Sequence, residues 1–221
     1  AIRDSRVMGT RSIVEALSNL NVRPKVLVSA SAIGFYGERG DEEMNESSTA
    51  GHGFLAEVAK EWEGEARRAE DAGIRTVLLR TGIVLSKDGG ALGTMLTPFK
   101  MGVGGVIGSG TQWMSWISLD DHVAAINFVI ENDNIRGAVN AASPGPVTNE
   151  EFTKTMGEVL YRPTFIPLPE FAVSMLMGEM GDALLLTSTK VIPKRLEDAG
   201  FEFKYPDLKG ALEHALSETP E

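Results

Sequence analysis

Hydroxyl side chains follow a short apolar run and are the first residues in the chain that could take part in chemistry. Ser29 and Ser31 come directly after Val26-Leu27-Val28, and Tyr36 follows shortly afterwards. Open α/β sheets bind ligands at the carboxyl ends of their strands, so we expect Ser29 and Ser31 to face a ligand. Tyr36 has two interpretations: a substitute general acid, or an interior tyrosine bonded to a backbone carbonyl, which we favour.

A second group of candidates lies further along the chain. Gly82 interrupts the apolar segment from Thr76 to Leu85, where its backbone could approach a flat ring or form a strand bulge. Trp113 and Trp116 could stack on a sugar or a base, but packing in a core is an equally good interpretation.

Composition excludes several classes of protein. The 221 residues contain no cysteine, which excludes disulfides, cysteine-bound metals and thiol nucleophiles, and the three histidines are scattered. The net charge of −10 argues against nucleic-acid binding, because such a protein must neutralise phosphates. No apolar run is long enough to span a membrane. We therefore expect a cytoplasmic protein without a nucleic-acid or membrane partner and without a metal.

Strand and helix patterns alternate along the first two thirds of the chain, which favours βαβ units and a doubly wound parallel sheet. The last third is helical and interrupted by prolines, which suggests a small lobe over the carboxyl edge of the sheet. We expect domains at 1–146 and 147–221. The predicted strands lie near 26–28, 76–85, 113–118 and 139–142, and the predicted helices near 53–71, 123–131, 149–160, 169–180 and 207–216.

The first residues already have the pattern of an amphipathic helix. Ile13, Val14, Ala16 and Leu17 are spaced to form one buried face. Because a domain rarely begins inside such a helix, we expect the chain to begin partway through a fold.

Several segments taken together resemble the extended short-chain dehydrogenases/reductases. The matching features are an Asn-x-x-Gly-Thr helix, a strand end with serines before Tyr-Gly, an Arg-x-x-Asn-Val segment and a Gly-x-Gly-x-Gln…Asp-Asp stretch. Here they stand at Arg6 to Thr10, Ser29 to Gly37, Arg80 to Leu85 and Ile107 to Asp121.

A narrower resemblance is to the atypical sugar-nucleotide epimerase-like subgroup, which carries a C-terminal helical domain. It is carried by Ser-Ala-x-Gly-Phe-Tyr-Gly, Phe-Leu-Ala-Glu-Val-Ala-Lys-Glu-Trp-Glu, Lys-Asp-Gly-Gly-Ala-Leu and Phe-Ile-Pro-Leu-Pro. The resemblance implies a Rossmann-like α/β fold, here incomplete, because the glycine-rich phosphate loop of the family would precede Ala1. It also implies NADP, or NAD, bound weakly or not at all by this fragment. The cofactor-binding positions that it implies are Arg6, Ser29, Ala30, Leu55 and Gly82.

The catalytic positions of the family are vacant in this chain. The resemblance places the catalytic Ser or Thr at Ala32, the Tyr at Leu55 and the Lys at Ala59, and none of these side chains can exchange a proton. Ser31 and Tyr36 are weak substitutes, so the catalytic residues stay unknown. Lys60 could replace the missing Lys, but it lies one position out of register, so we favour a solvated surface lysine. We interpret Glu57 and Glu63 in the same way as carboxylates of the helix face, with acid/base work as the alternative.

Two functions stay open. The first is an NAD(P)-dependent oxidoreductase or epimerase acting on a nucleotide-sugar-like substrate, since hydride transfer depends mainly on the placement of the cofactor. The second is a non-catalytic nucleotide-binding protein with a structural or regulatory role, which the three vacancies favour. Ser115 stands where the family often has an Arg, which weakens the case for a diphosphate. The expected partner is a nucleotide or nucleotide sugar, and a homodimer stays open.

Overall fold

The computed structural model describes most of the chain, namely residues 2–165, 167–169 and 187–217. Its centre is a parallel sheet of three strands in the spatial order β1 (Val26–Ala32), β3 (Arg75–Thr81) and β7 (Gly137–Ala141). The register places Ser31 opposite Arg80, and Arg80 opposite Asn140. Polar side chains near the ends of three strands therefore meet at one edge of the sheet.

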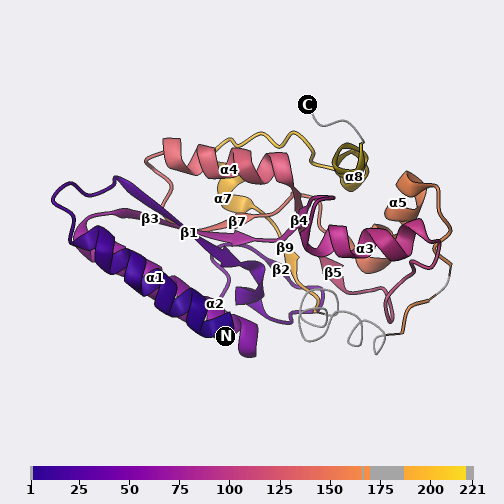
Figure 1. Ribbon diagram of the computed structural model, residues 1–221, viewed down its shortest axis with the longest axis horizontal. Helices are drawn as coiled ribbons and strands as arrows, with labels where there is room; N and C mark the ends of the chain where they lie inside the picture. Colours follow the sequence, from indigo (N-terminus) through magenta and orange to yellow (C-terminus); the bar gives the residue numbers. More distant parts are fainter. Residues whose placement is uncertain (1, 166, 170–186, 218–221) are drawn as a thin grey trace.

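Helices cover both faces of this sheet, as a parallel sheet requires. Figure 1 shows α1 (Ile2–Ser18) and α2 (Phe54–Arg67) on one face, with α4 (Leu119–Glu131) on the other. Val77 and Leu79 of β3 pack with α4 residues and with α7 (Lys194–Asp198) in one apolar cluster. The alternation of side chains along β3 then turns Arg80 towards α2.

Short strand pairs extend the structure beyond the central sheet. A 3-10 turn, η1 (Ile33–Tyr36), leads out of β1, and a second, η2 (Arg68–Ala72), follows α2. The pairs are β2 (Glu43–Met44) with β9 (Lys190–Val191), β4 (Ile83–Leu85) with β6 (Trp116–Ser118), and β5 (Trp113–Met114) with β8 (Val147–Thr148).

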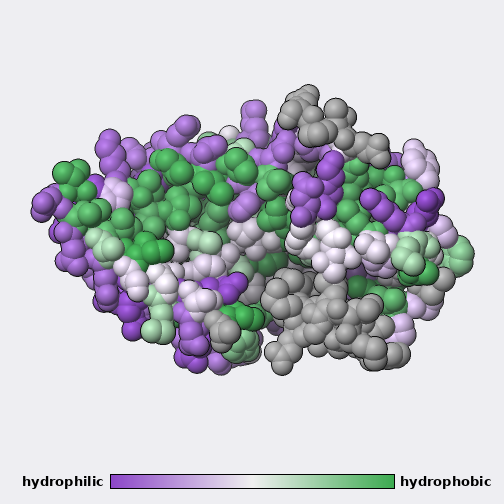
Figure 2. Space-filling view, viewed as in Figure 1, coloured by the Kyte–Doolittle hydropathy of each residue, from purple (hydrophilic) through white to green (hydrophobic). Residues whose placement is uncertain are grey.

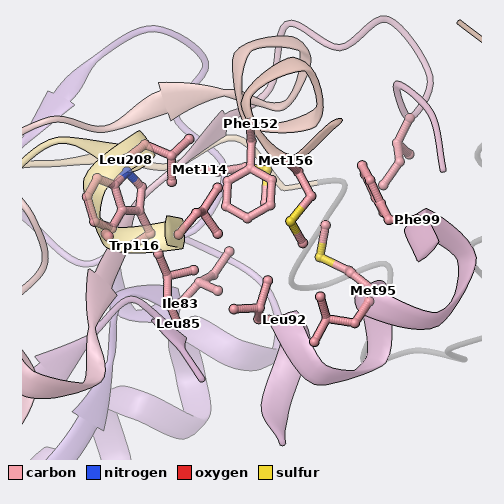
Figure 3. Close-up of a cluster of buried hydrophobic side chains, with 14 residues drawn as sticks. Ile83, Leu85, Leu92, Met95, Phe99, Met114, Trp116, Phe152, Met156 and Leu208 are labelled. Atoms are coloured by element: carbon pink, nitrogen blue, oxygen red, sulfur yellow. The ribbon is translucent and has the colours of Figure 1, made fainter. Parts of the chain in front are cut away.

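A second apolar core lies beside the sheet. Figure 3 shows Trp116, Phe152 and Met156 packed together within it. Three helices contribute to this cluster: α3 (Gly90–Lys100), α5 (Asn149–Leu160) and α8 (Leu208–Leu216).

The parallel α/β fold predicted from the sequence is confirmed. Thr148 followed three residues later by Glu151 is a sequence pattern that predicts a capping box, and the structure confirms it. The Thr148 side chain accepts a hydrogen bond from Glu151 N, and the Glu151 side chain accepts one from Thr148 N. The predicted strand over 76–85 is wrong in one respect, because it divides at Gly82 into β3 and β4. The predicted helix over 169–180 lies mostly outside the described residues. The boundary between 146 and 147 stays a prediction.

The buried face predicted for the first helix is only partly right. Val14 is buried, whereas Ile13 is 56% exposed. None of the described helices combines the length and the apolar character that crossing a membrane would need.

Candidate functional site

The two serines at the end of β1 are buried and point towards α2. The Ser31 hydroxyl donates to Glu63 Oε1 at 2.7 Å, and the Ser29 hydroxyl makes a longer contact of 3.3 Å to the Ala30 carbonyl. Between them, Ala30 points to the opposite face of the sheet and is exposed. Ser31 is thus committed to a protein partner, whereas Ser29 has a weaker one.

A buried ion pair joins α2 to β3 directly behind these serines. Arg80 Nε donates to Glu63 Oε1 at 2.8 Å, and Arg80 Nη2 donates to Glu63 Oε2 at 2.9 Å. Both residues are at most 4% exposed. Such a two-pronged pair is the strongest and most directional form that an Arg and a carboxylate can make. The sequence-based interpretation of Glu63 as a solvated surface carboxylate is therefore wrong.

Tyr36 belongs to the same buried network. Its hydroxyl accepts a hydrogen bond from Arg80 Nη1 at 3.0 Å and donates to Asn140 Oδ1 at 2.7 Å. The side chain is fully buried, and burial raises the pKa of the phenol above its ordinary value. A role for Tyr36 as a substitute acid stays a prediction, and these contacts favour the alternative of a structural tyrosine. Its acceptor is a side-chain amide and not the backbone carbonyl expected from the sequence.

The structure places Arg6 on α1 and against α2. Its guanidinium lies 5.4 Å from the centre of the Trp62 ring, and Nη1 donates to the Ile2 carbonyl at 3.3 Å. The side chain is exposed. No contact in the described part of the chain joins Arg6 to Ser29 or Gly82, so the three do not form one cluster.

Leu55 and Gly82 pack against different neighbours. A Cβ at Gly34 of η1 would lie 3.4 Å from Leu55 Cβ, so the start of α2 packs directly on the turn after β1. A Cβ at Gly82 would lie 2.7 Å from the Ser115 carbonyl oxygen. This close backbone approach explains the glycine without a ligand, and a contact between Gly82 and a cofactor stays a prediction.

The two tryptophans have different surroundings. Trp116 is fully buried and its indole donates to the Gly145 carbonyl at 2.9 Å, which makes it a core residue. Trp113 is half-buried, donates to Asp41 Oδ1 at 2.9 Å and has Lys190 Nζ 4.5 Å from its ring centre.

An apolar hollow of about 410 Å³ lies between β1 and α4. Ala30, Thr81 and His122 line the end of it that is nearest the carboxyl ends of the strands. His122 Nδ1 is buried and has no hydrogen-bond partner in the structure, and burial lowers the pKa of this imidazole below its ordinary value. In Figure 2, apolar side chains gather over α4 and the part of the sheet beside it. His122 is thus neutral near pH 7, in an apolar setting.

The carboxyl end of β1 presents small side chains and few polar groups. Ala30 is exposed and Ala32 is half-buried, with the half-buried Gly34 just beyond them. The carboxyl ends of parallel strands are where such folds bind nucleotides. Leu55 and Ala59, however, offer no donor to a ribose hydroxyl, so a nucleotide bound here would need ribose donors from elsewhere.

Sequence reasoning missed the residues that dominate this region. Glu63, Arg80 and Asn140 are buried, and each bonds to side chains on other elements. A usable signal was present: Arg80 follows three consecutive apolar residues in a predicted buried strand, where an unpaired charge would be very costly. A partner on a neighbouring element could have been expected from that fact alone.

A parallel sheet covered on both faces, with small and hydroxyl side chains at its strand ends, defines a Rossmann-like dinucleotide-binding class of fold. The family model described as the NAD dependent epimerase/dehydratase family matches residues 1–142. The chain belongs to this family. A second model, a domain of unknown function called DUF1731, matches residues 168–215.

Individual relatives agree with this assignment. The chain is 44% identical over 213 residues to the chloroplastic epimerase family protein SDR39U1 homolog of Arabidopsis thaliana, covering 96% of this chain and 61% of the relative. It therefore spans less than two thirds of that relative. The human epimerase family protein SDR39U1, solved with NADPH, superposes with a TM-score of 0.90 at 34% identity, covering 96% of this chain and 72% of that one. The nucleoside-diphosphate sugar epimerase of Corynebacterium glutamicum gives a TM-score of 0.82 at 36% identity, with 97% and 42% covered.

Proposed function

We propose that the protein carrying this chain is an NAD(P)-dependent oxidoreductase or epimerase-like enzyme that acts on a nucleotide-sugar-like substrate. The observation that carries the proposal is the set of small side chains, Ala30 and Ala32, at the carboxyl end of β1. They occur in a fold that superposes on a relative solved with NADPH. When bound, the nicotinamide would supply hydride transfer to or from a carbon of the sugar.

NADP is the cofactor that we favour over NAD, because the human relative was solved with NADPH. Ala30 on one face of β1, and Ser29 and Leu55 on the α2 side, would flank the ring end of the cofactor, with Gly82 at the neighbouring strand end. Arg6 would contribute positive charge from α1, where its exposed guanidinium would exchange its contacts with the Trp62 ring and the Ile2 carbonyl for a phosphate or ribose.

The nucleotide-sugar substrate class is supported by the name of the Corynebacterium relative. The catalytic residues stay unknown. We retain the division into a cofactor domain at 1–146 and a helical lobe at 147–221, and a cytoplasmic location, as proposals. A homodimer stays open in the same way.

A titration of the full-length protein that carries this chain tests the proposal. NADPH and NADH are added separately while tryptophan fluorescence is followed, and nucleotide sugars are then screened for turnover. Saturable NADPH binding with measurable oxidation or epimerisation supports the proposal. If neither dinucleotide binds, the cofactor assignment is wrong.

A non-catalytic, nucleotide-binding protein is the second candidate. It is favoured by one observation: Ala32, Leu55 and Ala59 cannot donate or accept a proton, and the buried Tyr36 hydroxyl is already committed to Arg80 and Asn140. Tight NADPH binding without turnover on any nucleotide sugar supports this candidate. Arg6→Ala should weaken NADPH binding in either case, whereas Arg3→Ala, which removes an exposed partner of Glu61, should not.

A further inference from the structure

We propose that Arg80 and Tyr36 are positioning residues that couple the cofactor end of β1 to the segment 187–195, so that filling the site fixes this segment in place. The segment contains β9 and the start of α7, and it lies within the match to the domain of unknown function. The proposal rests on the proposed function, because it takes the strand end as the cofactor site. The proposal gives segment 187–195 a role at that site, because the segment is linked to the carboxyl end of β1.

The first half of the link lies on the α2 side of the sheet, next to the carboxyl end of β1. Ser31 Oγ and Arg80 Nε both donate to Glu63 Oε1, while Arg80 Nη2 donates to Oε2. Three elements, β1, α2 and β3, are thereby joined at one carboxylate. The Phe35 ring lies 3.4 Å from the guanidinium carbon of Arg80, so the turn after β1 is held on the same group.

The second half of the link runs from Tyr36 across the sheet. Arginine can only donate, so the Tyr36 oxygen must accept from Arg80, and its single hydrogen goes to Asn140 Oδ1. This fixes the orientation of the amide, whose Nδ2 donates to the Ile192 carbonyl at 3.0 Å. Burial raises the pKa of Tyr36 above its ordinary value, so its proton stays in place near neutral pH. The direction of every bond in the chain is therefore determined.

A second contact ties the same segment to β7. Glu46 Oε1 accepts from Asn140 N at 3.0 Å, and the two carboxylate oxygens accept from Arg195 N at 3.2 Å each. The backbone and the side chain of Asn140 thus both lead to 187–195.

The segment also touches the loop that leaves the proposed site. Thr189 Oγ1 donates to the Gly37 carbonyl at 3.2 Å, and Arg39 N donates to the Ser188 carbonyl at 3.2 Å. Loop 33–40 is therefore held between α2 on one side and 187–195 on the other. A ring bound at Ala32 would lie next to the start of this loop, and the network joins the loop to 187–195.

Hydrogen exchange of the full-length protein, with and without NADPH, tests the coupling. The variant is Tyr36→Phe, which removes one hydroxyl and leaves the ion pair intact. The matched control is Tyr161→Phe, at a tyrosine that is 89% exposed. We expect Tyr36→Phe to speed exchange in 187–195 by about tenfold, since it leaves a buried Asn140 oxygen and an Arg80 donor unpaired. Exchange at 26–32 should not change, and the control should behave as the wild type.

NADPH gives the second readout. In the wild type and the control it should slow exchange in 187–195 by about fivefold, a typical coupling between sites, and in Tyr36→Phe this protection should be lost. The coupling is refuted if NADPH binds without protecting 187–195 in the wild type, or protects it equally in Tyr36→Phe.

The test separates this inference from the proposed function. If no dinucleotide binds, the proposed function is wrong. A Tyr36→Phe effect confined to 187–195 still supports the structural link in that case, and its absence overturns the link. Should Tyr36→Phe fail to fold, Arg80→Lys replaces it, because a lysine keeps the charge but cannot span both Glu63 and Tyr36.

Discussion

Replacing Arg80 by methionine should lower the free energy of unfolding far more than the loss of an exposed arginine would. The side chain is 3% exposed and makes three hydrogen bonds, two of them to Glu63 and one to Tyr36. In Arg80→Met, the buried Glu63 carboxylate keeps the Ser31 hydroxyl as its one side-chain donor among the described residues. A buried charge that loses its partner is among the few changes that unfold proteins outright.

The size of the effect follows from this geometry. Breaking a buried ion pair by removing one partner costs about 3–5 kcal/mol. For a chain of this length each kcal/mol lowers the melting temperature by about 2–4 °C, so Arg80→Met should melt roughly 6–20 °C lower. The double variant Glu63→Leu with Arg80→Met removes both charges and should recover much of this loss.

Urea unfolding followed by circular dichroism measures these free energies. The matched control is Arg3→Met, because Arg3 also makes a two-pronged pair with a glutamate of α2, Glu61, but at side chains 56% and 39% exposed. An exposed pair contributes at most about 1 kcal/mol. If Arg80→Met costs no more than Arg3→Met, or if the double variant is less stable than Arg80→Met, the reasoning from burial is refuted.

Three further predictions concern stability. The hydrogen bonds from Arg11 and Arg68 hold the pKa of Glu65 at about 2, against 4.5 unperturbed, so this contribution is complete above about pH 4.5 and is lost as the pH falls towards 2. Acid melting curves of the wild type and Glu65→Gln should converge over that range, and a constant gap would contradict the prediction. Burial lowers the pKa of His122, so the unfolded chain takes up a proton first and stability should fall as the pH drops below 6.5. His122→Gln should lose that pH dependence in thermal melts, and an unchanged profile would count against it. Gly82→Ala should lower the free energy of unfolding by about 1–3 kcal/mol, measured by urea unfolding, because the new Cβ would meet the Ser115 carbonyl. The control, Gly64→Ala in α2, places its Cβ where no atom lies within 4 Å and should be neutral or stabilising. Equal effects of the two substitutions would refute the argument.

Much of the fold could be predicted from the sequence because local signals were strong. The apolar run at 26–28 and the capping box at Thr148 each depend on residues close together in the chain, and the structure bears both out. The division of the predicted strand at Gly82 was harder to predict, since it depends on the approach of the Ser115 backbone, 33 residues away in the chain. Periodicity carries no information about such an approach.

The candidate site was less predictable for a related reason. The family resemblance identified the strand end and the vacancies at Leu55 and Ala59, which needed only motif positions. The role of Glu63 depends on its pairing with Arg80, 17 residues away, and on a helix face that the hydrophobic pattern alone does not determine. A charged residue on the buried stripe of a helix becomes recognisable only when its partner on a strand is found.

The central claim is that the carboxyl end of β1 receives the ring end of a nicotinamide dinucleotide. The most direct measurement is NADPH affinity, determined by fluorescence titration of the full-length protein, for Ala32→Tyr and for a control, Val22→Tyr. Val22 lies in the connection between α1 and β1 and is 86% exposed. We expect Ala32→Tyr to weaken binding at least about tenfold, which corresponds to about 1.4 kcal/mol, and Val22→Tyr to leave it unchanged. Unchanged NADPH affinity in Ala32→Tyr would contradict the account.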